Sequence, residues 1–166
     1  LPANMTATSV NGVFAARTET DRRKTPRILD GEVMFDMPVM IHKLHMGDEL
    51  KKTGYNSDGV SFNEKVYSQD VRNCKACHEY SAATPQGDNW KDKPSRLACG
   101  SCHDYINWAT GKDYRGAGAS YPGHPGIGGA QADDSNCVLC HKAAYIEEAH
   151  IPVIASATTD VTGATV

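Results

Sequence analysis

The sequence predicts a fold of short α-helices and long loops, with minor β-structure in the N- and C-terminal segments. Three observations predict it. The 166 residues have the length of one domain, and with a mean hydropathy of -0.48, three Phe and two Trp their side chains can build only a modest hydrophobic core. All six cysteines fall into three Cys-x-x-Cys pairs. The stretches between the pairs are rich in Gly, Pro and Asp, which favour turns and loops.

The charge pattern excludes a nucleic-acid-binding domain. The 17 Lys and Arg are scattered among 20 Asp and Glu, for a net charge of -3, whereas such domains carry clustered basic residues. No apolar run approaches the ~18 residues of a membrane span. The first cysteine is Cys74, so we expect no lipid on an N-terminal cysteine. Because the chain begins at Leu1, we expect a removed leader or a fragment.

Each Cys-x-x-Cys pair is followed at once by a histidine, although only 7 of the 166 residues are His. The motifs are Cys74, Cys77 and His78, then Cys99, Cys102 and His103, then Cys137, Cys140 and His141. In c-type haem attachment the two thiols bind the two vinyl groups of one haem, and the following imidazole lies under the iron as its proximal ligand. The spacing therefore predicts three haem c groups per chain. Their large apolar faces would supply much of the core.

Three other interpretations of the cysteines fit the pattern poorly. Zinc ribbons need four ligands, so their pairs come in twos. Disulfides would not require the histidines. A thioredoxin-like redox pair would be single and would lie in a βαβ context. The predicted fold class is therefore a haem-packed multihaem cytochrome c.

Four further histidines are candidate distal ligands for three irons: His42, His45, His124 and His150. A lone histidine is more often a surface or core residue, but three irons that lack a sixth ligand change that balance. Four methionines of residues 34–46 offer an alternative axial ligand, which would raise the reduction potential of the haem iron. With four histidines available, the sequence favours bis-His ligation and low, mostly negative potentials. One histidine is then left over, either idle or a ligand to a haem of another subunit or of a missing part of the chain.

Local patterns support the four histidines unequally. Pro38 suits a first helical position and Gly47 a C-terminal cap, so His42 and His45 lie at i, i+3 on one helical face. One short helix can then serve two haems; the alternative is a buried helix with two partly exposed histidines. His150 follows His141 closely enough to fold back on the haem region. His124 lies in the Gly- and Pro-rich loop 116–129 and has the weakest local pattern.

The chain divides into three predicted regions. Residues 1–37 form an N-terminal extension with possible strands at 7–16 and 28–37. Residues 38–152 form the trihaem domain, with short helices at 38–46, 70–78, 95–109 and 134–148 that begin at caps Asp70, Ser95 and Asp134 for the last three. Residues 153–166 are a strand-prone tail, either frayed or paired with the N-terminal segment of the same chain or of a neighbour.

Several stretches carry a family resemblance: residues 40–47, 70–74, 88–91, 94–104, 107–111, 133–137 and 148–152. They resemble the outer-membrane multihaem cytochromes of metal-reducing bacteria, the OmcA/MtrC family, and cover most of residues 39–153. In that family a pentahaem domain is flanked by β-barrel domains in a decahaem chain. The resemblance implies electron transfer to extracellular acceptors such as metal oxides or flavins, and it matches His42, His45, His124 and His150 to distal positions. The two haem motifs that in the family normally precede the helix with His42 and His45 are absent, so the decahaem architecture does not carry over to this chain.

The predicted function is electron transfer without catalytic residues. Catalysis at haem needs an open distal position, so four distal candidates argue against a multihaem reductase. The leftover histidine suggests a subunit of a cytochrome filament that ligates haem between copies of the chain. The alternative is a monomeric or docked carrier, or a fragment of a larger surface cytochrome. Other copies of the chain and other multihaem cytochromes are the expected partners. Haem attachment occurs outside the bacterial cytoplasm, which predicts an extracellular or cell-surface location, with the periplasm as the alternative.

Overall fold

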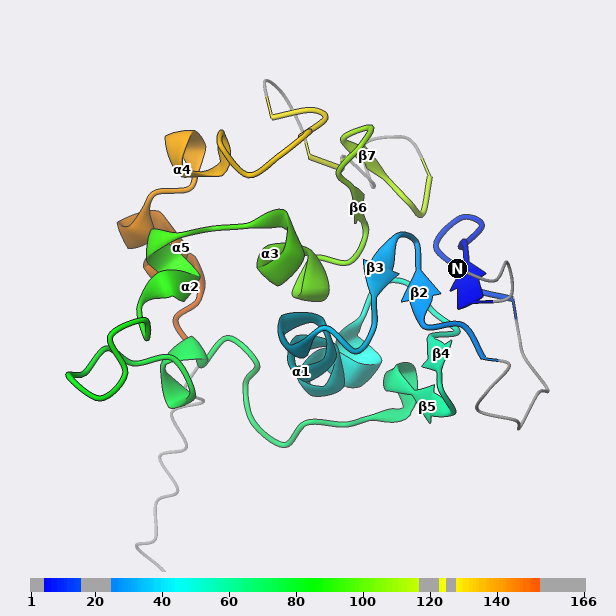
Figure 1. The fold of residues 1–166 in the computed structure, drawn as a ribbon, viewed down its shortest axis with the longest axis horizontal. Coiled ribbons are helices and arrows are strands. Elements are labelled where there is room, and N and C mark those ends of the chain that lie inside the picture. Colours follow the sequence, from blue (N-terminus) through cyan, green and yellow to red (C-terminus); the bar gives the residue numbers. More distant parts are fainter. Residues whose placement is uncertain (1–4, 16–24, 117–122, 125–127, 153–166) are drawn as a thin grey trace, which may run out of the picture.

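Short helices joined by long loops make up most of the molecule (Figure 1). The computed structural model describes residues 5–15, 25–116, 123–124 and 128–152. The α-helices are α1 (Met37–Met46), α2 (Asn89–Asp92), α3 (Arg96–Cys102), α4 (Cys137–Cys140) and α5 (Ala143–Ala149), and the 3₁₀ turns are η2 (Gly47–Glu49), η3 (Phe62–Glu64) and η4 (Cys74–Ala76). α1 packs on α3, and α2 packs on α5. Of the helices in the described ranges, none is long and apolar enough to cross a bilayer.

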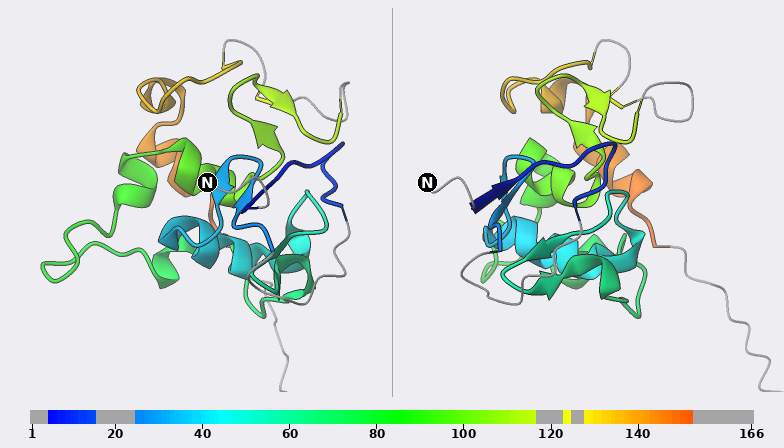
Figure 2. Two further views of the ribbon diagram at one scale, coloured as in Figure 1. Left: turned by 45° about the vertical axis from the view of Figure 1, so that its right-hand side comes forward. Right: turned by 90° about the vertical axis from the view of Figure 1, so that its right-hand side faces the viewer.

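Two-residue strands form small separate sheets (Figure 2). β1 (Thr6–Ala7) runs parallel to β2 (Ile28–Leu29), which pairs antiparallel with β3 (Glu32–Val33). β4 (Asn56–Ser57) with β5 (Val60–Ser61), and β6 (Ile106–Asn107) with β7 (Lys112–Asp113), are antiparallel pairs. The expected strand at 28–37 is thus a hairpin followed by the start of α1, and the expected strand at 7–16 is wrong beyond Ala7 within the described residues.

Asx-Gly dipeptides explain these corrections. Asp30 and Gly31 have φ of 50° and 85°, and Asp58 and Gly59 have φ of 51° and 78°, the left-handed pair of a type I′ turn. The same pair at residues 11–12 (φ 49° and 76°) turns the chain between bridged Val10 and Val13. The dipeptides at 11–12 and 30–31 reverse the chain where continuous strands were expected, and Asp58-Gly59 forms the turn between β4 and β5.

The side-chain core occupies only one part of the chain. A single cluster of buried residues forms it: Phe14, Leu29, Met34, Val39, Leu50, Tyr55 and Phe62. In the described part of 70–152, Ile146 is the one large hydrophobic side chain that is buried, at 8% exposure. The part of the chain with every Cys-x-x-Cys pair therefore lacks a polypeptide core of its own.

Helix α1 confirms the prediction for 38–46. Pro38 lies in its first turn, and the amide of Gly47 donates to the carbonyl of Lys43 at its end. Gly47 has a φ of 46°, and a Cβ there would overlap the carbonyl of Lys65. Glycine is therefore required both by the backbone angle and by the close approach of residue 65.

The other predicted helices are shorter than expected. Residues 70–78 form only η4, because the side chain of Asp70 accepts from the amide of Arg72 (2.9 Å) in a local turn instead of capping a helix. Ser95 caps α3 as predicted and accepts from the amide of Ala98 (3.2 Å), but α3 ends at Cys102.

The helix predicted at 134–148 is divided into α4 and α5. Asp134 does not cap it, because its carboxylate accepts from Arg96 instead (2.7 and 3.0 Å). Asn136 is the residue that precedes α4. The predicted tail at 153–166 lies outside the described residues.

The two roles of Gly47 predict a large loss of stability on substitution. Gly47→Ala adds left-handed backbone strain of about 1 kcal/mol to the overlap with Lys65, so we expect a loss above about 2 kcal/mol in chemical denaturation. Gly31→Ala is the control, because Gly31 also has a positive φ (85°) but no atom within 4 Å of its added Cβ. Equal losses in the two variants would show that the close approach to Lys65 has no energetic weight.

Candidate haem sites

The three Cys-x-x-Cys-His motifs share one backbone turn, although they lie in different elements. We name them the first motif (74–78), the second motif (99–103) and the third motif (137–141). In each, the amide of the histidine donates to the carbonyl of the first cysteine, at 2.8, 2.8 and 2.9 Å respectively. Helical spacing of i, i+3 puts both thiols of a motif on one side of its turn, and the histidine leaves the turn at its end.

All six cysteines are free, and burial disfavours the reactive thiolate form of four of them. Burial raises the pKa of Cys102 to about 12, and burial also raises the pKa of Cys74, Cys99 and Cys137. A thioredoxin-like pair has a lowered pKa at one thiol. These four thiols therefore lack the electrostatics of that alternative.

Each motif histidine faces one of the distal candidates. The ring centroids of His42 and His78 are 6.0 Å apart. Those of His103 and His150 are 6.2 Å apart, and those of His124 and His141 are 6.1 Å apart. Two metal–nitrogen bonds of about 2 Å, plus about 1 Å from each nitrogen to its ring centre, give about 6 Å. The three separations fit one iron between each pair of imidazoles.

Hydrogen bonds at Nδ1 orient the candidates. Nδ1 of His150 lies 2.7 Å from the carbonyl of Ile146, and Nδ1 of His124 lies 3.1 Å from the carbonyl of Gly129. A donor at Nδ1 leaves the lone pair of Nε2 for a metal. His42 differs, because its buried Nδ1 has no hydrogen-bond partner; the nearby carbonyl of Pro38 only opposes the lowering of its pKa.

Burial keeps two of these imidazoles neutral. Burial lowers the pKa of His42, and the neighbouring His78 and His45 lower it further. Burial also lowers the pKa of His103, and His150 adds to that effect, while Asp104 opposes it. The neutral form is the one that binds a metal, so the lowered pKa of both imidazoles favours ligation over protonation.

His45 is the candidate that faces no motif histidine. Its ring lies 4.5 Å from that of Tyr67, edge-on at 89°. Its Nδ1 is 2.7 Å from the carbonyl of Ile41, the same orientation as in His150 and His124. Of four distal candidates, His45 is thus the one that the structure leaves over.

Further features of this region fit a large apolar cofactor that bears carboxylates. Leu97, Val138 and Leu139 are 40–64% exposed within or beside the motifs, where a porphyrin face would cover them. The indole Nε1 groups of Trp90 and Trp108 are buried without a hydrogen-bond partner, which is unusual for a buried donor. Haem propionates are acceptors of the kind that these two N–H groups lack.

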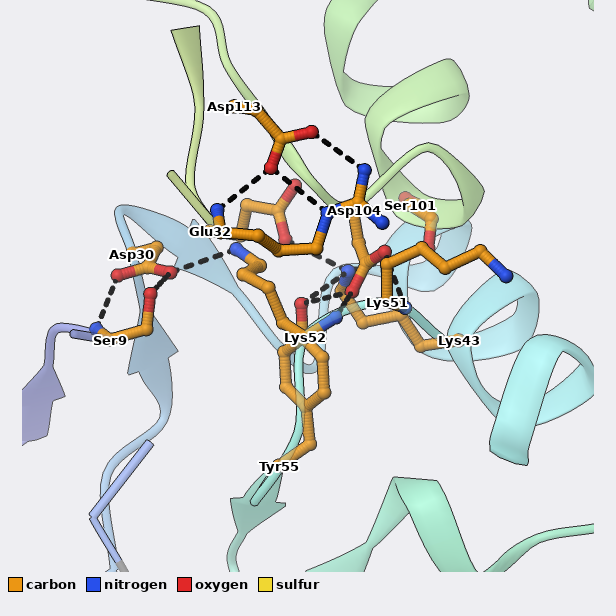
Figure 3. Close-up of polar contacts among 11 residues, drawn as sticks. Ser9, Asp30, Glu32, Lys43, Lys51, Lys52, Tyr55, Ser101, Asp104 and Asp113 are labelled. Atoms are coloured by element: carbon orange, nitrogen blue, oxygen red, sulfur yellow. Dashed lines mark hydrogen bonds and ion pairs between the residues drawn. The ribbon is translucent and has the colours of Figure 1, made fainter. Parts of the chain in front are cut away.

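A buried polar network joins the side-chain core to the second motif (Figure 3). The side chain of Lys43 is fully buried (0% exposed), and its Nζ lies 3.1 Å from Oε2 of Glu32 in an ion pair. The angles of this contact are not those of a hydrogen bond. Its Nζ also donates to the hydroxyl of Tyr55 (3.4 Å) and the carbonyl of Ser101 (3.3 Å). Lys43 thereby fixes α1, with His42, to the second motif. Its only local signal in the sequence is a lysine within an apolar helix.

Asp104, directly after His103, extends this network. It accepts from the amides of Lys51 (3.0 Å) and Lys52 (2.9 Å) and from the hydroxyl of Tyr55 (3.0 Å). Burial raises the pKa of Tyr55 well above its usual value of 10.0, and the charge of Asp104 raises it further. Asp104 therefore draws the chain after His103 toward residues 51–55, which explains why no helix continues to residue 109.

Ion pairs connect the motifs with each other. Glu147 of α5 pairs with Lys75 of the first motif and with Lys91 of α2 (3.0 Å). Arg96 of α3 pairs with Asp134, ahead of the third motif (2.7 Å). These pairs are partly exposed and add little stability individually, but they set the relative positions of segments far apart in sequence.

The second motif neighbours both of the others. It lies in and directly after α3, which packs on α1, the helix that bears His42 of the first pair. Arg96 of α3 pairs with Asp134, ahead of the third motif. The first and third motifs are thus each joined to the second.

The short-helix fold and the repeated Cys-x-x-Cys-His turns are those of a multihaem cytochrome c. A family model described as "Outer membrane cytochrome MtrC/MtrF-like, domains II/IV" matches residues 11–151. The chain belongs to this family of MtrC/MtrF-like outer membrane cytochromes. The family resemblance found in the sequence is thereby confirmed, and MtrC-like multihaem cytochromes bind c-type haem.

Two known proteins are similar to the chain. "Multiheme cytochrome MtrC" of Shewanella baltica is 31% identical over 99 residues, which are 55% of this chain and 13% of that protein. The crystal structure of MtrC from Shewanella baltica OS185 is 27% identical and covers 72% of this chain and 14% of its own, with a TM-score of 0.46. The chain thus spans only a small part of the length of these relatives.

Lys43 gives the network a testable energetic weight. Lys43→Met removes a fully buried cation and leaves Glu32, Tyr55 and the carbonyl of Ser101 without it, so we expect a loss of about 3 kcal/mol in chemical denaturation. Adding Glu32→Gln to Lys43→Met should recover part of the loss. Arg27→Met, which breaks the exposed pair with Asp58, is the control and should cost less than about 1 kcal/mol. A loss no larger than in that control would contradict the importance of the network.

Proposed function

We propose that the chain is an electron-transfer protein that carries three bis-His haem c groups. The first haem would be held by Cys74, Cys77, His78 and His42. The second would be held by Cys99, Cys102, His103 and His150, and the third by Cys137, Cys140, His141 and His124. The observation that carries the proposal is the separation of 6.0–6.2 Å between the rings of each pair, which suits one iron and pairs each motif with a different candidate.

The chain's residues would perform electron transfer chiefly by keeping the iron sites rigid. Haem supplies a one-electron change between ferric and ferrous iron. Nδ1 hydrogen bonds at His150 and His124, and burial at His42, would hold each imidazole in place in both oxidation states. Little then has to rearrange when an electron arrives or leaves. Two axial histidines also leave no open position on the iron, which argues against reductase chemistry.

The neighbouring motifs favour a continuous route between haems. The second motif is joined to both others, because α3 packs on α1 with His42 and Arg96 of α3 pairs with Asp134 ahead of the third motif. Electrons would pass between the first and third haems through the second. Family membership supports a cell-surface or extracellular location, and extracellular acceptors such as metal oxides or flavins and other multihaem cytochromes as partners; the periplasm is the alternative location.

His45 supports a connection to a haem outside these 166 residues. It is half-buried, and its Nδ1 lies 2.7 Å from the carbonyl of Ile41, which leaves the lone pair of Nε2 for a metal, as in His150. The iron would belong to a neighbouring segment or to a partner cytochrome, because the three irons of another copy of the chain would each have two histidines already. Because the chain spans 13% of its MtrC relative, a part of a larger surface cytochrome is the second candidate.

Single substitutions of the four candidates test the ligand assignment. In the haem-loaded protein, His42→Ala, His124→Ala and His150→Ala should each convert one of three haems from low-spin to high-spin, because each removes the sixth ligand of one iron. His45→Ala is the matched control and should leave all three low-spin. Magnetic circular dichroism gives the spin states, and haem content by pyridine haemochrome should be three per chain throughout. A low-spin His150→Ala protein, or a high-spin His45→Ala protein, would contradict the pairing.

Negative-stain electron microscopy of the native material separates filament from single carrier. Regular filaments of the native material are expected if the chain is a filament subunit, and they should persist in His45→Ala, because no iron of another copy has an open axial position for His45. Compact single particles at every concentration would exclude the filament and leave a monomeric or docked carrier.

A further inference from the structure

We propose that the second haem differs electronically from the other two, and that Trp90 is the positioning residue responsible. Trp90 would hold His150 so that the two axial imidazoles of this haem are perpendicular, whereas those of the other haems are closer to parallel. The second haem would then have the highest reduction potential of the three and would be reduced first. This inference depends on the proposed bis-His ligation.

The three histidine pairs differ in angle and not in distance. Their ring centroids are all 6.0–6.2 Å apart. The rings of His103 and His150 cross at 89°. In the first pair the interplanar angle is 37°, and in the third it is 23°. In a bis-His haem both imidazole planes are perpendicular to the porphyrin plane. The angle between the two imidazole planes would therefore equal the relative rotation of the two ligands about the iron.

Trp90 is placed to fix the orientation of His150. The two rings meet edge-on, with centroids 6.2 Å apart at 81°, and Trp90 belongs to α2, which packs on α5 directly before His150. Lys91, the next residue, pairs with Glu147 of α5 at 3.0 Å. Together with the Nδ1 contact to Ile146 (2.7 Å), these interactions leave His150 little freedom to rotate.

The partner ring of His103 is held independently. Its centroid lies 6.2 Å from that of Tyr105, edge-on at 75°. The guanidinium of Arg115 covers the Tyr105 ring at 4.7 Å and is held by both carboxylate oxygens of Asp113 (3.0 and 2.7 Å). Both ligands of the second haem therefore have an aromatic ring against their edge, and the perpendicular arrangement is supported from both sides.

Ligand orientation changes the iron through its d orbitals. An imidazole donates π-electron density into the d orbital that is perpendicular to its plane. Two parallel imidazoles raise the same d orbital, which favours the ferric state with its single vacancy there; two perpendicular imidazoles raise one each and leave the pair nearly degenerate. Axial ligation is one of the means by which a protein sets haem potential. The second haem should therefore be easier to reduce than neighbours with the same two ligands.

The position of this haem gives the difference a role. The second motif lies in and beside α3, which packs on α1 with His42 of the first pair and is joined through Arg96 to Asp134 ahead of the third motif, so electrons that enter at either outer haem would reach the second haem first. A higher potential there would retain one electron between two relay haems of lower potential. In the one-electron-reduced chain the electron would occupy the second haem. The outer haems would carry further electrons only when the chain is more fully reduced.

Electron paramagnetic resonance of the oxidised haem-loaded protein tests the inference. We expect one third of the low-spin iron in a highly anisotropic signal with a single large g value, typical of perpendicular ligands, and two thirds in rhombic signals. In a reductive titration, the large-g signal should disappear first. Three rhombic signals, or a large-g signal that disappears last, would overturn the inference while leaving bis-His ligation intact. High-spin or His–Met iron in magnetic circular dichroism would overturn both.

Variants of Trp90 test its positioning role. Trp90→Ala should shift or broaden the large-g signal while all three haems stay low-spin, because His150 remains a ligand but loses its orientation. Trp90→Phe keeps a ring against His150 and should restore the signal. Trp108→Ala is the matched control, since Trp108 packs edge-on against His124 (5.5 Å, 66°) and should alter a rhombic signal only. An unchanged large-g signal in Trp90→Ala would overturn the role of Trp90.

Discussion

The hydrogen bond that closes each Cys-x-x-Cys-His turn is the constraint on which the rest of the structure depends. It runs from the histidine amide to the first cysteine carbonyl in all three motifs, at 2.8–2.9 Å. Each turn thereby presents, within five residues, two thiols for covalent haem attachment and one imidazole as the first of two axial ligands. The second axial ligand has to come from elsewhere in the chain. Three different kinds of structure supply it: helix α1 for His42, the end of α5 for His150 and a loop for His124. Long loops follow from this requirement, because three separate segments have to return to three fixed turns.

The distribution of apolar side chains explains why these sites and the fold are interdependent. The cluster around Leu29, Val39 and Tyr55 stabilises the described residues of 14–62, but the described residues of 70–152 bury Ile146 alone among large hydrophobic side chains. What joins this part to the core is polar: Lys43 with Glu32 and Ser101, and Asp104 with the amides of residues 51 and 52. Such contacts position segments but contribute little net stability once desolvation is counted. Covalent haem would supply the missing apolar contact area, so folding and haem attachment would be coupled.

Membership of the MtrC/MtrF-like family rests on residues 11–151, a span that includes both the side-chain core and all three motifs. The side-chain core and the haem-motif part therefore lie within one family unit, and Phe14, Leu29 and Met34 are buried together with Val39 of α1. His45 gives this unit an outward connection, because it is held like a ligand and faces Tyr67 instead of a motif histidine.

The sequence by itself determined the three motifs, the family and the helix that bears His42 and His45, because each depends on consecutive residues: a thiol pair with its histidine, or a proline and a glycine around one apolar stripe. The hairpins had local signals too, in Asp30-Gly31 and Asp58-Gly59, that a search for alternation alone passes over. Only the tertiary structure decided which histidines face one another, and that two tryptophans and a buried lysine would hold them. Four histidines can be matched to three motifs in many ways. The choice depends on contacts between residues tens of positions apart, such as Lys91 with Glu147 and Lys43 with Ser101, and no local pattern records them.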